Sequence, residues 1–310
     1  MGQLIRPHLA GHLAMLMFSA TVAGSFSLGG SVANDISPVA LNTVRFWVAV
    51  AILGFVMKLT GKGSRQTFKA PWRYAILGGL YACYFVLMFM ALKSTSPVNL
   101  SVVFTLTPVM AGGFGYFLLR QVMSPRIALA LAIGGAGAVW VIFRGDLNAF
   151  LAFEVGSGEA RYFWGCAAHA LYTPLARRLN RGAHVIPYTF GTLLAAAIWI
   201  TGYGWRDLLL TDWMNLPNLV WITILYIAVF ATSVSSLLLL FATQRLPSSK
   251  VMAYTYLVPT WVIAWEYIRH AYVPPGIVLV GVAMTLLALL LLHVPPWPPP
   301  TTSSPIGCRA

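Results

Sequence analysis

The chain has 310 residues, of which 59% are hydrophobic and only 9% are charged. A soluble domain carries roughly a quarter charged residues, so this composition excludes a soluble globule of this size. Apolar runs of about twenty residues, the length that crosses a bilayer as a helix, recur along the sequence. The net charge of +13 lies in short loops rather than in one basic stripe, so we expect no nucleic-acid partner.

Ten apolar segments are predicted, separated by short corners that contain Pro, Gly or charged residues. They cover roughly residues 12–34, 38–59, 72–93, 97–118, 125–144, 160–178, 185–205, 217–244, 247–270 and 273–293. We therefore predict an all-α membrane protein with a first five-helix repeat at 1–145, an extracytoplasmic linker at 146–159, a second five-helix repeat at 160–293 and a Pro-rich cytoplasmic tail at 294–310.

Two distant stretches, Ala91 to Pro108 and Ala242 to Pro259, share one pattern at an offset of 151 residues. Each runs from the end of one apolar segment, through a polar corner, to a proline inside the next segment. Only three of the eighteen aligned positions are identical, so the pattern is the evidence for a repeat. Five segments per half would place the second half in the membrane upside down, as in transporters built from inverted repeats around a central cavity.

The basic residues predict the orientation of the chain in the membrane. With the N-terminus inside, fourteen Lys and Arg residues fall on the inner side and five on the outer side. We expect a multi-pass protein of the bacterial inner membrane with both termini in the cytoplasm.

Short motifs open the two halves, and they carry a resemblance. They are Gly24-Ser25-Phe26, Ser37-Pro38 and Arg45-Phe46 in the first half, and Phe163-Trp164-Gly165, Ala170-Leu171-Tyr172 and Leu175-Ala176-Arg177-Arg178-Leu179 in the second. With the two interior prolines they resemble the ten-helix EamA type of the drug/metabolite transporter superfamily over about residues 12–293. Within that superfamily the chain is similar to bacterial aromatic amino acid exporters.

The resemblance implies a basket of ten helices around a cavity lined mainly by segments 1, 3, 4, 6, 8 and 9, with 5 and 10 at the periphery. It also implies alternating-access export of amino acids, above all Trp, Phe and Tyr, and of related metabolites. One departure concerns a glutamate that family members often carry some eleven residues after each interior proline. Here Leu119-Arg120-Gln121 and His270 stand in those neighbourhoods, so a proton-coupling role cannot be carried over.

The interior prolines predict breaks in two helices, because proline lacks the N–H that a helix needs. Pro108 removes the usual donor for the carbonyl of Phe104, and Pro259 does the same for Thr255. In a membrane such a carbonyl needs protein, water or substrate as a partner. The prolines therefore predict either cavity-facing kinks or kinks that are only tolerated.

Polar and aromatic residues inside the segments are the candidates for substrate binding, since a flat substrate gains from stacking. They are Tyr81, Tyr84, Asn99, Trp164, His169, Tyr172 and Tyr256. The alternative is that the tyrosines and tryptophans form the aromatic belts found at membrane interfaces.

Arg45 and Glu266 are charges within apolar runs, and such residues usually face a cavity or a partner. Their predicted depths allow three interpretations. They form an ion pair near the outer side, or Arg45 attracts a substrate carboxylate, or Arg45 is structural and Glu266 lies at the rim beside Arg269.

No catalytic, metal-binding or cofactor-binding pattern is visible, so we expect neither an enzyme nor a cofactor. The expected partners are a small-molecule substrate of the amino acid class and the lipid bilayer, and a monomer is compatible with the sequence. An efflux pump for cationic drugs is the first alternative, although such pumps use carboxylates within the membrane. An integral membrane enzyme is the second, although it would need a catalytic cluster.

Overall fold

The computed structural model describes residues 2–63, 69–121, 124–143, 146, 148 and 155–293, without the side chains of residues 2–8, 292 and 293. Its regular structure in these residues is entirely helical. Among them, seven helices are long and apolar enough to cross a membrane: Leu9–Ser31, Pro38–Thr60, Pro71–Ala91, Pro97–Leu119, Pro125–Ile142, Val185–Leu210 and Asn218–Thr243. The predicted tail at 294–310 and residues 147 and 149–154 of the predicted linker lie outside the described residues.

The helices follow the order of the predicted segments, but three segments are divided. The first half contains α1 (Gly2–Ser31), α2 (Pro38–Thr60), α3 (Pro71–Ala91), α4 (Pro97–Phe104), α5 (Thr107–Leu119) and α6 (Pro125–Ile142). The second half contains α8 (Ser157–Leu179), α9 (Val185–Leu210), α10 (Asn218–Ala228), the π-helix η2 (Val229–Val234), α11 (Ser235–Thr243), α12 (Ser248–Ala253), the 3₁₀-helix η3 (Tyr254–Leu257), α13 (Val258–His270) and α14 (Gly276–His293).

Two helices begin earlier than predicted. α1 starts at Gly2 rather than near residue 12, and α8 starts at Ser157, inside the predicted linker. Apolar residues mark the part of a helix that crosses the membrane, whereas the hydrogen-bonded ends continue into polar sequence. In α8 the early start also places Glu159 in the first turn, where a negative charge is favoured.

Three Ser-Pro corners start helices in the same way. Ser37, Ser96 and Ser124 are the N-caps of α2, α4 and α6, and each is followed by proline at the first helical position. Each serine hydroxyl accepts a hydrogen bond from a backbone N–H of the first turn, at 3.2–3.4 Å. The cap satisfies a donor that the helix leaves open, and proline has no donor to satisfy.

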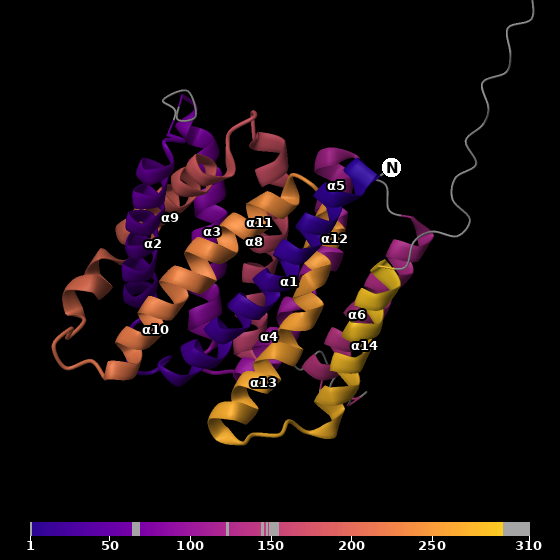
Figure 1. The fold of residues 1–310 in the computed structure, drawn as a ribbon. Helices are drawn as coiled ribbons and strands as arrows, with labels where there is room; N and C mark the ends of the chain where they lie inside the picture. Colours follow the sequence, from indigo (N-terminus) through magenta and orange to yellow (C-terminus); the bar gives the residue numbers. More distant parts are fainter. Residues whose placement is uncertain are drawn as a thin grey trace, which may run out of the picture.

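The helices form one bundle with two flanking pairs, as Figure 1 shows. α6 and α14 pack on each other at one flank, and α2 packs on α9 at the other. α1, α3, α4, α8, α11 and α13 lie between these pairs. α6 and α14 approach closely because Gly137 and Gly281 face each other: a Cβ built on Gly137 would lie 2.9 Å from the carbonyl oxygen of Gly281.

The two helices that are broken before Pro108 and Pro259 pack against each other inside the bundle. α5 contacts α12 and α4 contacts α13, so the C-terminal part of one helix lies beside the N-terminal part of the other. At the α5–α12 end, Gln121 accepts a hydrogen bond from the backbone N–H of Ser248 at 3.2 Å. The two broken helices therefore run antiparallel.

Candidate functional site

Seven aromatic side chains from α3, α4 and α8 pack together inside the bundle. We call them the aromatic cluster: Tyr81, Tyr84, Phe85, Phe104, Tyr162, His169 and Tyr172. None of them is more than 2% exposed. Since α3 and α4 belong to the first half of the chain and α8 to the second, the cluster lies where the two halves meet.

Stacked rings hold the cluster together. The rings of Tyr84 and His169 are stacked with centroids 4.4 Å apart, and those of Tyr81 and Tyr172 with centroids 5.0 Å apart. The hydroxyl of Tyr162 donates to that of Tyr84 at 3.1 Å, and the hydroxyl of Tyr81 lies 2.8 Å from that of Ser236 in α11. Aromatic pairs of this kind are each worth about 0.5–1.5 kcal/mol beyond the area they bury.

His169 is the polar group of the cluster without a partner. It is 1% exposed, and neither ring nitrogen has a hydrogen-bond partner among the described residues. A neutral imidazole offers one donor and one acceptor, and leaving such a group unsatisfied costs about 1–3 kcal/mol. A planar ligand with a polar edge that entered the cluster would satisfy His169 while stacking on its neighbours.

Arg45 of α2 lies at one side of the cluster. Its guanidinium is 3.8 Å from the centroid of the Phe85 ring, a cation–π distance. It donates to the hydroxyl of Thr232 at 2.5 Å, to the carbonyl of Ala231 at 3.0 Å and to the side-chain oxygen of Asn42 at 3.3 Å. Arg45 is fully buried. The predicted ion pair with Glu266 is therefore not formed, because Arg45 is held by neutral groups of α2 and η2.

Glu266 of α13 has a different set of neighbours. It accepts a hydrogen bond from the hydroxyl of Ser27 in α1. Arg269 donates to the carbonyl of Ser27 at 3.2 Å and to the hydroxyl of Ser31 at 2.8 Å. Glu266 and Arg269 of α13 thus both contact Ser27 of α1.

Three of the predicted binding residues lie apart from the cluster. Trp164 is 68% exposed and packs edge-on against Phe163, so it does not share the side of α8 that carries His169. Tyr256 is fully buried with residues of α6 and α14, and a Cβ on Gly134 would lie 2.3 Å from its ring. Asn99 is half-buried in the first turn of α4, where its backbone N–H is capped by Ser96.

The backbone is interrupted just before both interior prolines, and protein groups satisfy both freed carbonyls. The Thr107 hydroxyl donates to the carbonyl of Phe104 at 2.6 Å. In the second helix the backbone N–H of Val258 bonds to the carbonyl of Thr255 across η3. The Thr107 and Thr255 hydroxyls lie 3.1 Å apart and join the two breaks. The Thr107 hydroxyl already donates its proton to the carbonyl of Phe104. In the bond between the two hydroxyls, Thr255 is therefore the donor and Thr107 the acceptor.

Several members of the site were missed at the level of sequence. The sequence pattern singles out Phe104 only for its backbone carbonyl, and it does not single out Tyr162, which lies near the start of its segment. Tyr162, Cys166, His169 and Thr173 follow a spacing of three to four residues on α8, and all four are buried. This stripe is the signal that could have identified the inward side of the helix.

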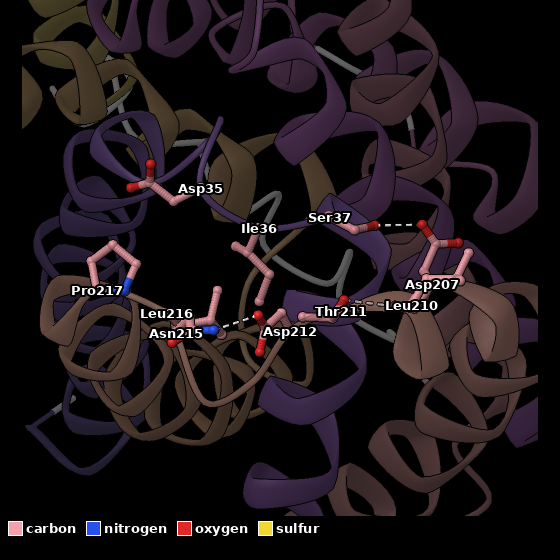
Figure 2. Close-up of a pocket in the computed structure, with 10 residues that line it drawn as sticks. All are labelled: Asp35, Ile36, Ser37, Asp207, Leu210, Thr211, Asp212, Asn215, Leu216 and Pro217. Carbon is pink, nitrogen blue, oxygen red and sulfur yellow. Dashed lines mark hydrogen bonds between the residues drawn. The ribbon is translucent and has the colours of Figure 1, made fainter.

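An acidic pocket of about 420 Å³ lies away from the cluster, between the α1–α2 and α9–α10 connections (Figure 2). Asp35, Asp207 and Asp212 line it. Asp207 accepts from the Ser37 hydroxyl at 2.7 Å, and Asp212 accepts from the Asn215 amide at 2.6 Å. In the described part of the chain no three His, Cys, Asp or Glu side chains are grouped so that they could hold a metal ion.

Comparison with known proteins gives three results. Residues 9–143 and residues 158–294 each match the model of the EamA-like transporter family. The chain is 25% identical over 255 residues to the "Uncharacterized transporter YyaM" of Bacillus subtilis (strain 168), covering 81% of this chain and 83% of that one. A protein solved by crystallography matches with a TM-score of 0.70 and 18% identity, covering 93% of this chain and 97% of its own. The last match shows a common fold.

Proposed function

Because the chain belongs to the EamA-like transporter family, we propose that it exports aromatic amino acids across the bacterial inner membrane by alternating access. The aromatic cluster is the observation that carries this proposal. It is buried between the two halves of the chain, and it combines stacked rings with the unsatisfied nitrogens of His169. A substrate with an aromatic ring would stack on these rings when the two halves of the chain separate.

In this proposal the chain consists of two inverted five-helix repeats, and alternating access arises from the movement of one repeat relative to the other. Three observations support this architecture: the family model matches the chain twice, the two broken helices run antiparallel, and each of them ends in a left-handed residue. These residues are Arg120 at φ 54° and Ala271 at φ 49°, again 151 positions apart (271 − 120). The packing between the halves repeats as well. α3 of the first half packs on α8, the first helix of the second half, and α11 of the second half packs on α1, the first helix of the first half. Inverted repeats of this kind have two related states that open to opposite sides.

Both ends of the bundle carry contacts that close the path to the cluster. At the end that carries the N-terminus, Arg177 and Arg178 of α8 donate to the carbonyls of Leu246 and Leu118. At the opposite end, α13 is joined to α1 through Glu266, Arg269 and Ser27. In the proposed cycle one set of contacts opens while the other stays closed. The excess of Lys and Arg at the N-terminal end supports a cytoplasmic position for it.

A pump for cationic drugs is disfavoured by the charge beside the cluster. That charge is the guanidinium of Arg45, which lies against Phe85 and repels a cation. Glu266, the carboxylate that the sequence places within an apolar run, is already engaged by Ser27.

The experiment is uptake of labelled tryptophan, phenylalanine and threonine into liposomes that contain the pure protein, with and without a pH gradient. We expect uptake of the two aromatic amino acids and little uptake of threonine. Equal uptake of all three, or of none, would remove the aromatic assignment. Dependence on the pH gradient would add proton coupling to the mechanism, and independence would indicate facilitated transport.

Two variants of one helix test the site itself. Tyr172→Leu removes a buried ring of the cluster, whereas Trp164→Leu removes an exposed ring from the same helix. We expect Tyr172→Leu to reduce tryptophan uptake at least tenfold and Trp164→Leu to leave it within twofold. Thermal unfolding in detergent checks that both variants are folded. Equal effects would show that the cluster has no special part in transport.

A further inference from the structure

Arg45 is a buried cation whose partners are all neutral. Its three hydrogen-bond acceptors are a hydroxyl, an amide oxygen and a backbone carbonyl. A guanidinium has five N–H groups, so two remain without a partner in the part of the chain that the structure describes. A buried charge of this kind is unfavourable unless an opposite charge approaches it.

The carboxylates of the described residues lie elsewhere. Six of the seven acidic residues are in the described part of the chain, and none of the contacts found for them involves Arg45. They are Asp35 and Asp207 at the acidic pocket, Asp212 with Asn215, Asp146 with the backbone of Asn148, Glu159 with Thr95, and Glu266 with Ser27. Since no carboxylate among the described residues contacts Arg45, we look for its negative charge in a ligand.

The surroundings of Arg45 hold the side chain in one place. η2 is a π-helix, in which the Thr232 hydroxyl donates to the carbonyl of Ile227 at 2.7 Å. The Thr232 hydroxyl donates its proton within its own helix, so its oxygen is free to accept a hydrogen bond from Arg45. Single π-turns inside α-helices are frequently found at functional sites. The guanidinium is thus fixed by the fold before any ligand binds.

The fixed guanidinium is connected directly to the aromatic cluster. Phe85 lies under it, and the Phe85 ring is 4.6 Å from that of Tyr84, which stacks on His169. A cation and a set of aromatic rings are therefore adjacent, and both belong to the region where the halves of the chain meet. A ligand that matches both parts has a negative group next to a flat ring.

We infer that Arg45 binds the carboxylate of the transported molecule, and that the substrates are small aromatic carboxylates whose amino group contributes little to recognition. This inference rests on the proposed function and adds the part of the substrate that is recognised. Arginine suits the task because its planar N–H groups match the two oxygens of a carboxylate. Since no carboxylate of the described chain lies beside the cluster, no ion pair there would select for an ammonium group.

Three indoles separate the groups of the substrate. Tryptophan carries both charges, indole-3-propionate carries only the carboxylate, and tryptamine carries only the ammonium group. Binding is measured by the shift in thermal unfolding of the pure protein in detergent, and transport by competition with labelled tryptophan in liposomes. We expect tryptophan and indole-3-propionate to shift the transition and compete within about fivefold of each other, with tryptamine at least tenfold weaker.

The outcomes distinguish this inference from the proposed function. If tryptamine binds as well as indole-3-propionate, or if neither carboxylate shifts the transition, the role of Arg45 is overturned. If indole-3-propionate shifts the transition but tryptophan is not transported, amino acid export is overturned while the carboxylate site is supported. This panel needs only the natural chain, so it does not depend on whether a variant folds.

Variants at Arg45 add a second test. Arg45→Lys keeps the charge, and we expect it to keep the preference for carboxylates with weaker binding. Arg45→Met removes the charge at similar length, and we expect the preference of at least tenfold to fall below threefold. Arg206→Met is the matched control, because Arg206 also lies over an aromatic ring, that of Trp205, but is exposed. A preference that survives in Arg45→Met would contradict the inference.

Discussion

The two broken helices occupy equivalent positions in the two halves, yet their breaks are built differently. Before Pro108 the freed carbonyl of Phe104 is satisfied by the side chain of Thr107. Before Pro259 the position that corresponds to Thr107 is Val258, which has no hydroxyl, and its backbone N–H bonds to the freed carbonyl of Thr255. The first break places Phe104 in the aromatic cluster, whereas the second turns Tyr256 toward α6 and α14.

The difference shows that two equivalent helices can keep the same arrangement while the residues at their breaks have different roles. The first break also contains two backbone hydrogen bonds of the 3₁₀ type, from Thr105 to Val102 and from Leu106 to Val103. The two breaks therefore differ in the donor that reaches the freed carbonyl and in where the neighbouring ring packs. The first break therefore belongs to the binding region and the second to the contact with the flanking pair. Four predictions test this division.

The largest effect is expected at the contact between the second break and α6. In Gly134→Ala the new Cβ would lie 2.3 Å from the Tyr256 ring, which is fully buried and has no free space to move into. We expect a loss of about 3 kcal/mol in the free energy of unfolding, as in other overpacked cores. The measurement is thermal unfolding in detergent.

The neighbouring glycine supplies the control for that substitution. A Cβ on Gly135 would meet only Val109 of α5, at 3.4 Å, which is an ordinary contact. We expect Gly135→Ala to change stability by less than about 0.5 kcal/mol. If Gly134→Ala and Gly135→Ala unfold at the same temperature, the second break is not held by α6 as described.

The next effect concerns the hydroxyl at the first break. Thr107→Val keeps the shape of the side chain but leaves the buried carbonyl of Phe104 without its donor. We expect a loss of about 2 kcal/mol in the free energy of unfolding. Thr107→Ser keeps the donor and is expected to lose less than half as much. Thr255→Val removes only the bond between the breaks and is expected to cost about 1 kcal/mol. Equal losses in Thr107→Val and Thr255→Val would contradict the asymmetry.

A gain in stability is expected at the end of the second broken helix. Ala271 has φ 49°, in the left-handed region that disfavours residues with a Cβ. Ala271→Gly should relieve this conformation, partly offset by the greater freedom of glycine in the unfolded chain, for a net gain of about 0.5 kcal/mol. The unfolding temperature of the variant in detergent checks it, and a decrease would mean that the methyl group of Ala271 makes a contact of its own.

The smallest effect is expected from Tyr256→Phe. The hydroxyl of Tyr256 is buried without a hydrogen-bond partner in the described residues, so its removal should leave stability within about 0.5 kcal/mol. Tryptophan uptake should also stay within twofold, because Tyr256 lies with α6 and α14 rather than with the cluster. A tenfold loss of uptake with unchanged stability would indicate that Tyr256 contacts the substrate after all.

Composition and corner residues predicted the helical organisation well, because proline and serine act locally. The Ser-Pro corners mark the true starts of α2, α4 and α6, since the cap and the proline both act within one turn. The starts of α1 and α8 were less accessible, because apolarity reports burial in the membrane and not backbone hydrogen bonding.

The site was harder to predict because direction matters more than residue type. Trp164 and His169 are five residues apart on α8, which separates them by about 140° around the helix, so both cannot face the cluster. Tyr256 follows Thr255 directly in the 3₁₀-helix η3, where successive residues point about 120° apart. Because Thr255 faces the first break, Tyr256 points away from it. The partners of Arg45 were hidden for another reason: the π-helix that presents Ala231 and Thr232 has no simple sequence signature.

The hydroxyl bond between Thr255 and Thr107 also has a mechanical consequence. It joins the two halves near their midpoints through one neutral hydrogen bond, which contributes only about 0.5–1.5 kcal/mol. The carbonyl of Phe104 keeps its own donor when that bond breaks, because Thr107 lies on the same side of the joint. A rocking motion about this point would therefore leave no backbone group exposed to hydrocarbon. In the proposed cycle the joint would give way easily, and the resistance to opening would come from the charged contacts at the two ends of the bundle.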